Sequence, residues 1–171
     1  MTHDIASMPG FVASAAAEVF SMFIGIELGE PTIEQLAGPT NQYDISAVVP
    51  LSGSLNGAIA LRAPVASASA FIEAFAGDPA APDSDEFSDA FGELANMVSG
   101  SAKAKYNSSS LSIGCPTVVL APEHKIKMPS GTECWAVRFE SPMGTFAVEV
   151  GLSAGAVEGT DWKMVEQSDA A

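Results

Sequence analysis

The sequence predicts an α+β domain in which long helices pack on a mostly antiparallel sheet. Two observations lead to this prediction. The period of the apolar residues changes along the chain, from helical spacing to strict alternation and back. Short turns separate several of the alternating segments, as in β-hairpins. The predicted order is therefore helix, hairpin, helix, helix and then three strands.

The first half of the chain contains a helix, a hairpin and a second helix. Apolar residues recur at helical spacing over residues 11–23. Alternation over 43–49 and again over 55–61, with turn residues between them, predicts two antiparallel strands. Helical spacing returns over 65–75 and stops at Gly77, a residue type that commonly ends a helix.

A second long helix is predicted from about Ser84 to Tyr106. Ser84 or Asp85 can cap its first turn, and acidic residues early in the helix suit the positive end of its dipole. Lys103 and Lys105 suit the negative end. This helix is the longest element that the sequence predicts.

Three strands complete the predicted sheet. The apolar run over 116–121 predicts the first, and alternation over 135–139 and 146–150 predicts the other two. Between the last two, residues 141–144 read Ser-Pro-Met-Gly, with Pro second and Gly fourth, which is typical of a type I turn.

Length and composition indicate one globular domain with few anionic partners. The 171 residues are 47% hydrophobic, enough to build one core, and we expect a single domain over 1–158 with a flexible acidic tail over 159–171. Twenty-one acidic residues against seven basic ones give a formal charge of −14, which repels phosphate backbones and anionic lipids. We therefore predict neither a nucleic-acid partner nor a membrane partner.

Targeting and redox signals favour a cytoplasmic location. The apolar stretch over 11–26 has no preceding Lys or Arg and contains Glu18, which argues against both a signal peptide and a membrane span. Cys115 and Cys134 can form at most one disulfide, and a domain of this size needs none. We expect both to be buried free thiols rather than partners of His124 in a catalytic dyad.

The long helix has an apolar face and an unusual polar face. The apolar stripe predicts a core contact through Phe87, Ala90, Phe91, Leu94 and Val98. The opposite side carries Asp89, Glu93, Asn96, Gly100 and Lys103, with Gly92 at the border. An asparagine in mid-helix and a glycine one turn to either side weaken a helix, but they leave the carboxamide open to a second protein. The alternative is an ordinary solvated face whose glycines accommodate packing.

Two segments carry a resemblance to a known family. Residues 89–103, DAFGELANMVSGSAK, resemble the signature helix of the CheX and CheC chemotaxis phosphatases, in which a Glu-x-x-Asn pair lies among similar residues. Residues 111–119, LSIGCPTVV, are similar to the stretch that follows this helix in CheX-like domains. The resemblance implies a CheC/CheX-like fold and a hydrolase that removes the aspartyl phosphate of a CheY-like response-regulator receiver domain.

The resemblance also implies roles for individual residues. Asn96 is expected to orient the attacking water, because a neutral carboxamide adds no negative charge beside the phosphoryl group. Glu93 would repel that group and is expected to pair with a receiver lysine. Partner contacts are expected from Asp89, Gly92, Gly100 and Lys103. The Mg²⁺ ion of such a site is expected in the receiver, so we predict no metal or cofactor held by this chain.

The resemblance favours one site per chain and a homodimer, as in CheX-like members. The first helix repeats the Glu/Gly spacing of the long helix with Glu18 and Gly25, but Ser21 stands where Asn96 would be. Two other functions remain open. One is a non-enzymatic CheX-like module that binds a regulator in a two-component signalling complex, although the intact carboxamide of Asn96 argues against it. The other is a small-ligand sensor, for which the sequence contains no pocket signal.

Overall fold

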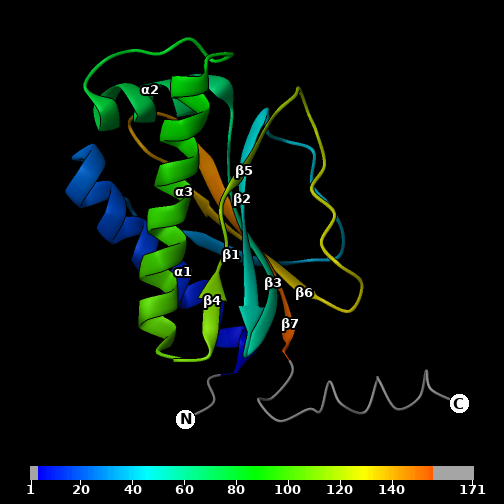
Figure 1. The fold of residues 1–171 in the computed structure, drawn as a ribbon. Helices are drawn as coiled ribbons and strands as arrows, with labels where there is room; N and C mark the ends of the chain where they lie inside the picture. Colours follow the sequence, from blue (N-terminus) through cyan, green and yellow to red (C-terminus); the bar gives the residue numbers. More distant parts are fainter. Residues whose placement is uncertain (1–3, 156–171) are drawn as a thin grey trace, which may run out of the picture.

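The computed structural model describes residues 4–155 of the chain, and Figure 1 shows the arrangement of its helices and strands. The predicted tail over 159–171 lies outside the described residues. The elements, in chain order, are α1 (Met8–Val19), β1 (Thr32–Leu36), β2 (Ile45–Gly53), β3 (Leu55–Ala63), α2 (Val65–Ala76), α3 (Asp85–Tyr106), β4 (Leu111–Ile113), β5 (Thr117–Leu120), β6 (Glu133–Phe139) and β7 (Phe146–Ala154).

The seven strands form one antiparallel sheet, which confirms the predicted α+β class. The strand order is β1-β6-β7-β3-β2-β4, and β5 also pairs with β2. Both β4 and β5 therefore lie along the outer edge of β2, β4 beside residues 51–53 and β5 beside residues 45–48. The three helices cover one face of the sheet, with α3 running past β4 and β5 (Figure 1).

Residues at the ends of the helices explain where each helix begins and ends. Ser84 caps α3 because its Oγ accepts a hydrogen bond from the backbone N–H of Phe87 at 3.2 Å. Gly77 ends α2 in the left-handed conformation, at φ 84°, as predicted. The first helix begins earlier than predicted, since Pro9 is favoured in a first turn, and a π-helical turn, Phe20–Ile24, carries it on to Gly25.

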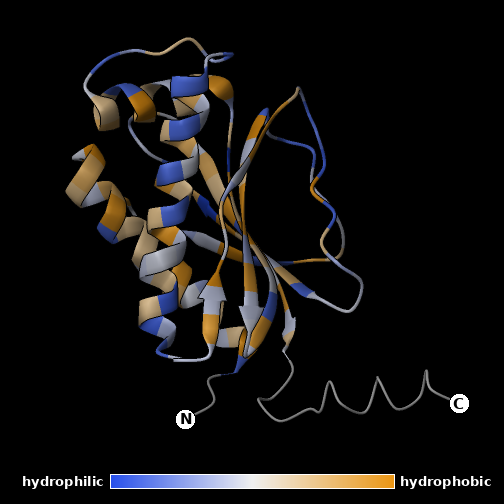
Figure 2. Cartoon of the chain, viewed as in Figure 1, coloured by the Kyte–Doolittle hydropathy of each residue, from blue (hydrophilic) through white to orange (hydrophobic). Residues whose placement is uncertain are grey.

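The core lies between the helices and the inner face of the sheet. Four phenylalanines pack where α1 and α2 meet β6 and β7, and Phe20 and Phe146 stack with ring centroids 4.5 Å apart. On α3, the predicted core residues Phe87, Phe91, Leu94 and Val98 are fully buried. Figure 2 shows the hydrophilic residues that this packing leaves along the visible side of α3. Because the apolar face of α3 is buried against the core, its polar face points away from the core.

One helical segment has the length and composition of a membrane span. Residues Ile5–Ile24 are apolar enough to cross a bilayer on these criteria alone. Its side chains Met8, Val12 and Phe20 are fully buried in the protein core, against α3 and the sheet. The structure therefore uses this segment as a core helix.

Two strands were not predicted, for different reasons. Four of the five β1 residues are exposed, so this edge strand has no apolar alternation to reveal it. Strand β4 has only three residues and is defined by its pairing with β2. Both depend on contacts with distant parts of the chain.

Ser99 on α3 provides a test of the packing beneath this helix. The side chain is fully buried, and within residues 4–155 its hydroxyl has no hydrogen-bond partner. Replacing Ser99 with alanine removes an unsatisfied polar group, so we expect the free energy of unfolding to rise by roughly 1 kcal/mol. Urea unfolding followed by circular dichroism measures this change. A lower stability would mean that the hydroxyl is hydrogen-bonded after all.

Candidate functional site

Helix α3 presents Glu93 and Asn96 on its outer side. Glu93 is exposed and Asn96 is half-buried. Residues three apart on a helix are neighbours, with about 5–6 Å between their Cβ atoms. Neither side chain forms a hydrogen bond or ion pair with the part of the chain that the structure describes. The carboxamide and the carboxylate are therefore available to a second molecule.

The predicted site residues follow one another along this helix. Asp89 is exposed one turn before Glu93, and Gly100 and Lys103 are half-exposed after Asn96. The rise of an α-helix places Asp89 and Lys103 about 21 Å apart along the axis. Acidic groups thus lie at one end of the strip and a cation at the other.

Gly92 departs from the prediction of an open strip. It is buried, and a Cβ atom at this position would lie 3.4 Å from Cγ of Pro116 and from Cγ2 of Val118. The chain between β4 and β5 folds along α3 and covers it. A hollow of about 500 Å³, open to solvent, remains beside this contact and is lined by Ser88, Asp89, Gly92, Glu93, Pro116 and Val118.

The segment after β4 is therefore a second wall of the site, which the predicted residues did not include. Ile113 lies opposite Gly100, because a Cβ atom at Gly100 would be 3.9 Å from Cδ1 of Ile113. Pro116 lies opposite Gly92 in the same way. Asn96 is midway between the two glycines and so is level with residues 114–115. Cys115 is exposed and Cys134 is half-buried, so the prediction that both are buried thiols is wrong. Cys115 is exposed because it lies in this connection and not in the sheet.

Packing alone does not explain the two glycines. An alanine Cβ at Gly92 or Gly100 would make ordinary van der Waals contacts and no clash. In a helix interior, glycine is about 1 kcal/mol less favourable than alanine. These positions therefore lower stability without relieving a steric conflict. This favours the interpretation that Gly100 keeps space free beside Asn96, whereas the space beside Gly92 is already filled by Pro116 and Val118.

The corresponding part of α1 is occupied by internal contacts. Glu18 forms an ion pair with Nζ of Lys105 at 2.9 Å and accepts a hydrogen bond from Ser101. The hydrogen bond from Lys105 lowers the pKa of the Glu18 carboxyl. The Ser21 hydroxyl donates to Glu27. Unlike Glu93, the glutamate of α1 is engaged within the chain.

No metal centre is formed by the described residues. Within residues 4–155, no group of three or more His, Cys, Asp or Glu side chains is placed to hold a metal ion. Within residues 4–155, the two acidic residues nearest to Asn96 along α3 are Glu93 and Asp89. Two exposed carboxylates on successive turns do not make a cation cage.

A serine–histidine pair lies on the other face of the sheet. Ser46 Oγ is 2.7 Å from Nε2 of His124, a geometry that nucleophile and base share in hydrolases. Ser46 is fully buried, however, and its oxygen accepts a hydrogen bond from Nε of Arg62. No substrate can reach this oxygen, so the pair is structural.

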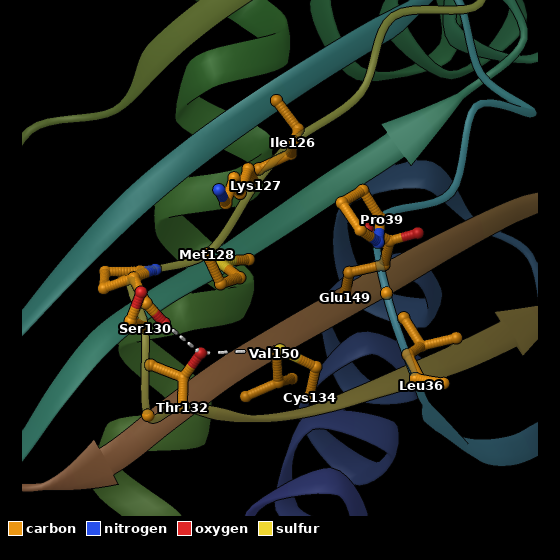
Figure 3. Close-up of a pocket in the computed structure, with 14 residues that line it drawn as sticks. Leu36, Pro39, Ile126, Lys127, Met128, Ser130, Thr132, Cys134, Glu149 and Val150 are labelled. Carbon is orange, nitrogen blue, oxygen red and sulfur yellow. Dashed lines mark hydrogen bonds between the residues drawn. The ribbon is translucent and has the colours of Figure 1, made fainter.

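The same face contains a cavity of about 250 Å³, which the sequence did not indicate (Figure 3). Its lining comes from the end of β1 at Leu36, from the connections 37–39 and 126–132, and from β6 and β7, including Cys134 and the buried Glu149. Both carboxylate oxygens of Glu149 are already bonded, one to Thr40 and one to Arg62. The cavity is separated from α3 by the sheet and is not part of the candidate site.

The chain is similar to known chemotaxis proteins in sequence and in fold. The family model described as chemotaxis phosphatase CheX matches residues 45–140, more than half of the chain. The CheX crystal structure from Desulfovibrio desulfuricans is 27% identical, with a TM-score of 0.71 over 86% of this chain and 99% of that one. A putative chemotaxis protein from Desulfovibrio vulgaris Hildenborough is 25% identical, with a TM-score of 0.78 over 86% of this chain and 97% of that one.

A further similar fold comes from a complex. A chain of the CheX-CheY-BeF3-Mg²⁺ complex from Borrelia burgdorferi is 20% identical, with a TM-score of 0.64 over 86% of this chain and 97% of that one. Among curated proteins there is no significant match. The matched region contains β2, β3, α2, the whole of α3 and the second wall. The chain therefore belongs to the CheX family of chemotaxis phosphatases.

Proposed function

We propose that this protein hydrolyses the aspartyl phosphate of a CheY-like response-regulator receiver domain. The observation that carries the proposal is the pair Glu93 and Asn96, exposed or half-exposed on the outer side of α3 without a partner in the described chain. This pair lies in the segment that the CheX family model matches. In the reaction, a water oxygen bonds to phosphorus, the bond from phosphorus to the aspartyl oxygen breaks, and inorganic phosphate leaves.

Asn96 orients the attacking water. Phosphoryl transfer requires little covalent chemistry from the enzyme, so catalysis consists mainly of positioning and charge stabilisation. The carboxamide of Asn96 can donate to or accept from a water without bringing a negative charge to the phosphoryl group. Its position is held because the residues on the opposite side of α3, Phe91 and Leu94 among them, are fully buried.

Glu93 docks the receiver through a lysine of that partner. Because Glu93 is exposed and unpaired within the described residues, its replacement by alanine should not disturb the fold. We expect Glu93→Ala to raise KM up to about fivefold at an unchanged kcat, since an exposed charge pair contributes at most about 1 kcal/mol. Steady-state phosphate release checks this. An unchanged KM with a lower kcat would move Glu93 into the chemical step.

Gly100 keeps the strip beside Asn96 clear for the receiver. We expect Gly100→Ala to raise the free energy of unfolding by roughly 0.5–1 kcal/mol, because alanine is the better helix residue, and to weaken receiver binding severalfold. Urea unfolding and titration with the receiver measure the two effects. Ser99→Ala is the matched control, since it is also expected to raise stability but its side chain is fully buried. Equal affinities of the two variants would assign Gly100 to helix packing.

The remaining residues of the strip contact the same partner. Asp89 and Gly92 border the hollow beside Glu93, and Lys103 follows Gly100 along the helix. The Mg²⁺ ion of the reaction belongs to the receiver in this proposal. A cytoplasmic location and pairing of two copies of the chain are parts of the same proposal.

A panel of phosphorylated receivers from the source organism tests the proposed function. Phosphate release is measured with and without the protein, and at least one receiver should lose its phosphoryl group faster in its presence. The second candidate, a module that binds a regulator without hydrolysis, predicts a different result. In that case a receiver would bind stably and keep its own phosphate lifetime.

A further inference from the structure

His124 holds the segment after β5 against the face of the sheet that the helices do not cover. We call its two hydrogen bonds, to Ser46 and to the Ala121 carbonyl, the anchor. After Leu120, the backbone N–H of Ala121 donates to the carbonyl of Asp44 at 2.9 Å. The chain then turns through Glu123, which has a positive φ of 49°, a conformation that non-glycine residues adopt only when their surroundings enforce it. His124 supplies that constraint. Its Nδ1 lies 2.7 Å from the Ala121 carbonyl and its Nε2 2.7 Å from Ser46 Oγ.

The hydrogen bonds around His124 fit a neutral imidazole that carries its proton on Nδ1. A carbonyl oxygen only accepts, so Nδ1 carries a proton that it donates to Ala121. Ser46 Oγ already accepts from Nε of Arg62 at 2.9 Å, which leaves its own hydroxyl proton to be donated to Nε2. A neutral imidazole therefore satisfies every group in the chain from Arg62 through Ser46 and His124 to Ala121.

A second proton on His124 would conflict with its surroundings. Nε2 would then donate to Ser46, and the serine proton would lose its acceptor. The imidazolium would also face the guanidinium of Arg62, which is fully buried and donates from Nη2 to the His124 carbonyl at 2.8 Å. The charged and titratable groups around this anchor are Arg62 on β3, Glu149 on β7, Tyr43 and Asp44 before β2, and Glu123 and Lys125 beside His124.

Strand β5, whose end is held by the anchor, also lines the candidate site. Strand β5 has only four residues, and it begins directly after Pro116 and contains Val118, which both line the hollow beside Glu93. Its sole strand partner within the described chain is β2, where Val119 pairs with Ser46. Ser46 thus pairs with β5 through its backbone and contacts the His124 ring through its hydroxyl. Loss of the anchor would free the end of a short edge strand.

We propose that neutral His124 is a positioning residue that fixes β5, and through it the Pro116–Val118 wall, against α3. Protonation of the imidazole would turn Nε2 into a donor and break the hydrogen bond that it accepts from Ser46, so we expect the wall to loosen when the pH is lowered. The effect on catalysis rests on the proposed function. The effect on β5 does not, because it concerns the free protein.

Hydrogen exchange of the free protein tests the anchor directly. Protection factors of the β5 amides, corrected for intrinsic exchange, are compared at pH 7.5 and 5.5, with the central strand β7 as internal reference. In the wild type we expect β5 protection to fall about tenfold at the lower pH, as for the loss of one hydrogen bond, and β7 to stay unchanged. His124→Gln can accept from Ser46 but does not titrate, so its protection should be independent of pH.

His124→Ala should show low β5 protection at both pH values. If this variant fails to fold, the comparison of the wild type with His124→Gln still decides. A pH-dependent fall that persists in His124→Gln, or wild-type protection that is equal at both pH values, would overturn the anchor.

The catalytic consequence is measured with a receiver that the wild type dephosphorylates. We expect His124→Ala at pH 7.5 to raise KM severalfold, and the ratio of wild-type to His124→Gln KM to rise as the pH falls. The glutamine variant corrects for titration of the receiver itself. Lost β5 protection with an unchanged KM would overturn the positioning role. A wild type without phosphatase activity would refute the proposed function and leave the exchange result intact.

Discussion

Replacing Asn96 with alanine is expected to lower kcat for receiver dephosphorylation by about 100-fold or more. Positioning the water is the main task left to the enzyme in phosphoryl transfer, and the carboxamide is the group that we propose for it. KM should change little, because Glu93 and the rest of the strip remain. Steady-state phosphate release from a phosphorylated receiver measures both constants.

Stability measurements separate this effect from a folding defect. Asn96 is half-buried and has no hydrogen-bond partner within the described chain, and alanine is the better helix residue. Asn96→Ala should therefore be as stable as the wild type or more so. Asn96→Asp keeps the shape but brings a negative charge to the phosphoryl group, and it should be as inactive as the alanine variant. Wild-type turnover in both variants would remove Asn96 from the mechanism.

Replacing Arg62 with methionine is expected to produce the largest loss of stability. Arg62 and Glu149 form a 2.9 Å ion pair with side chains that are 0% and 5% exposed. Removing one partner leaves the other charge buried and unpaired, which is destabilising by about 3–5 kcal/mol. The hydrogen bonds from Arg62 to Ser46 and to the His124 carbonyl are lost as well. Urea unfolding gives the difference.

The double variant Arg62→Met/Glu149→Gln distinguishes an unpaired charge from lost packing. It removes both charges and should recover a large part of the lost stability. A single-variant effect below 1 kcal/mol would mean that water solvates this pair. No recovery in the double variant would assign the effect to the Arg62 hydrogen bonds alone.

Features that depend on neighbouring residues could be predicted from the sequence. The capping of α3 by Ser84, the end of α2 at Gly77 and the buried stripe of α3 arise from local hydrogen bonding and helical spacing, and the structure confirms them. The placement of Glu93 and Asn96 on the outer side follows directly. Asn96 stood out because an amide between two glycines is unfavourable in the middle of a helix.

Features that depend on strand register could not be predicted. The wall opposite Gly92 exists because β4 and β5 share one edge of β2, and no pattern in residues 111–120 specifies that edge. Arg62, Ser46 and His124 likewise meet only in the folded sheet. Alternation could place Ser46 and Arg62 on the side of their strands away from the core, but the connection that brings His124 to them is irregular.

The most direct test of the α3 site is the lifetime of the phosphoryl group on a receiver saturated with protein. Single-turnover decay under these conditions separates hydrolysis from binding, since every receiver is bound. We predict that the wild type shortens the lifetime by about 100-fold or more relative to Asn96→Ala. The receiver bound to Asn96→Ala should decay at its own free rate. Equal decay with the two proteins would contradict the assignment of Asn96, and an unaltered lifetime with the wild type would contradict the phosphatase function itself.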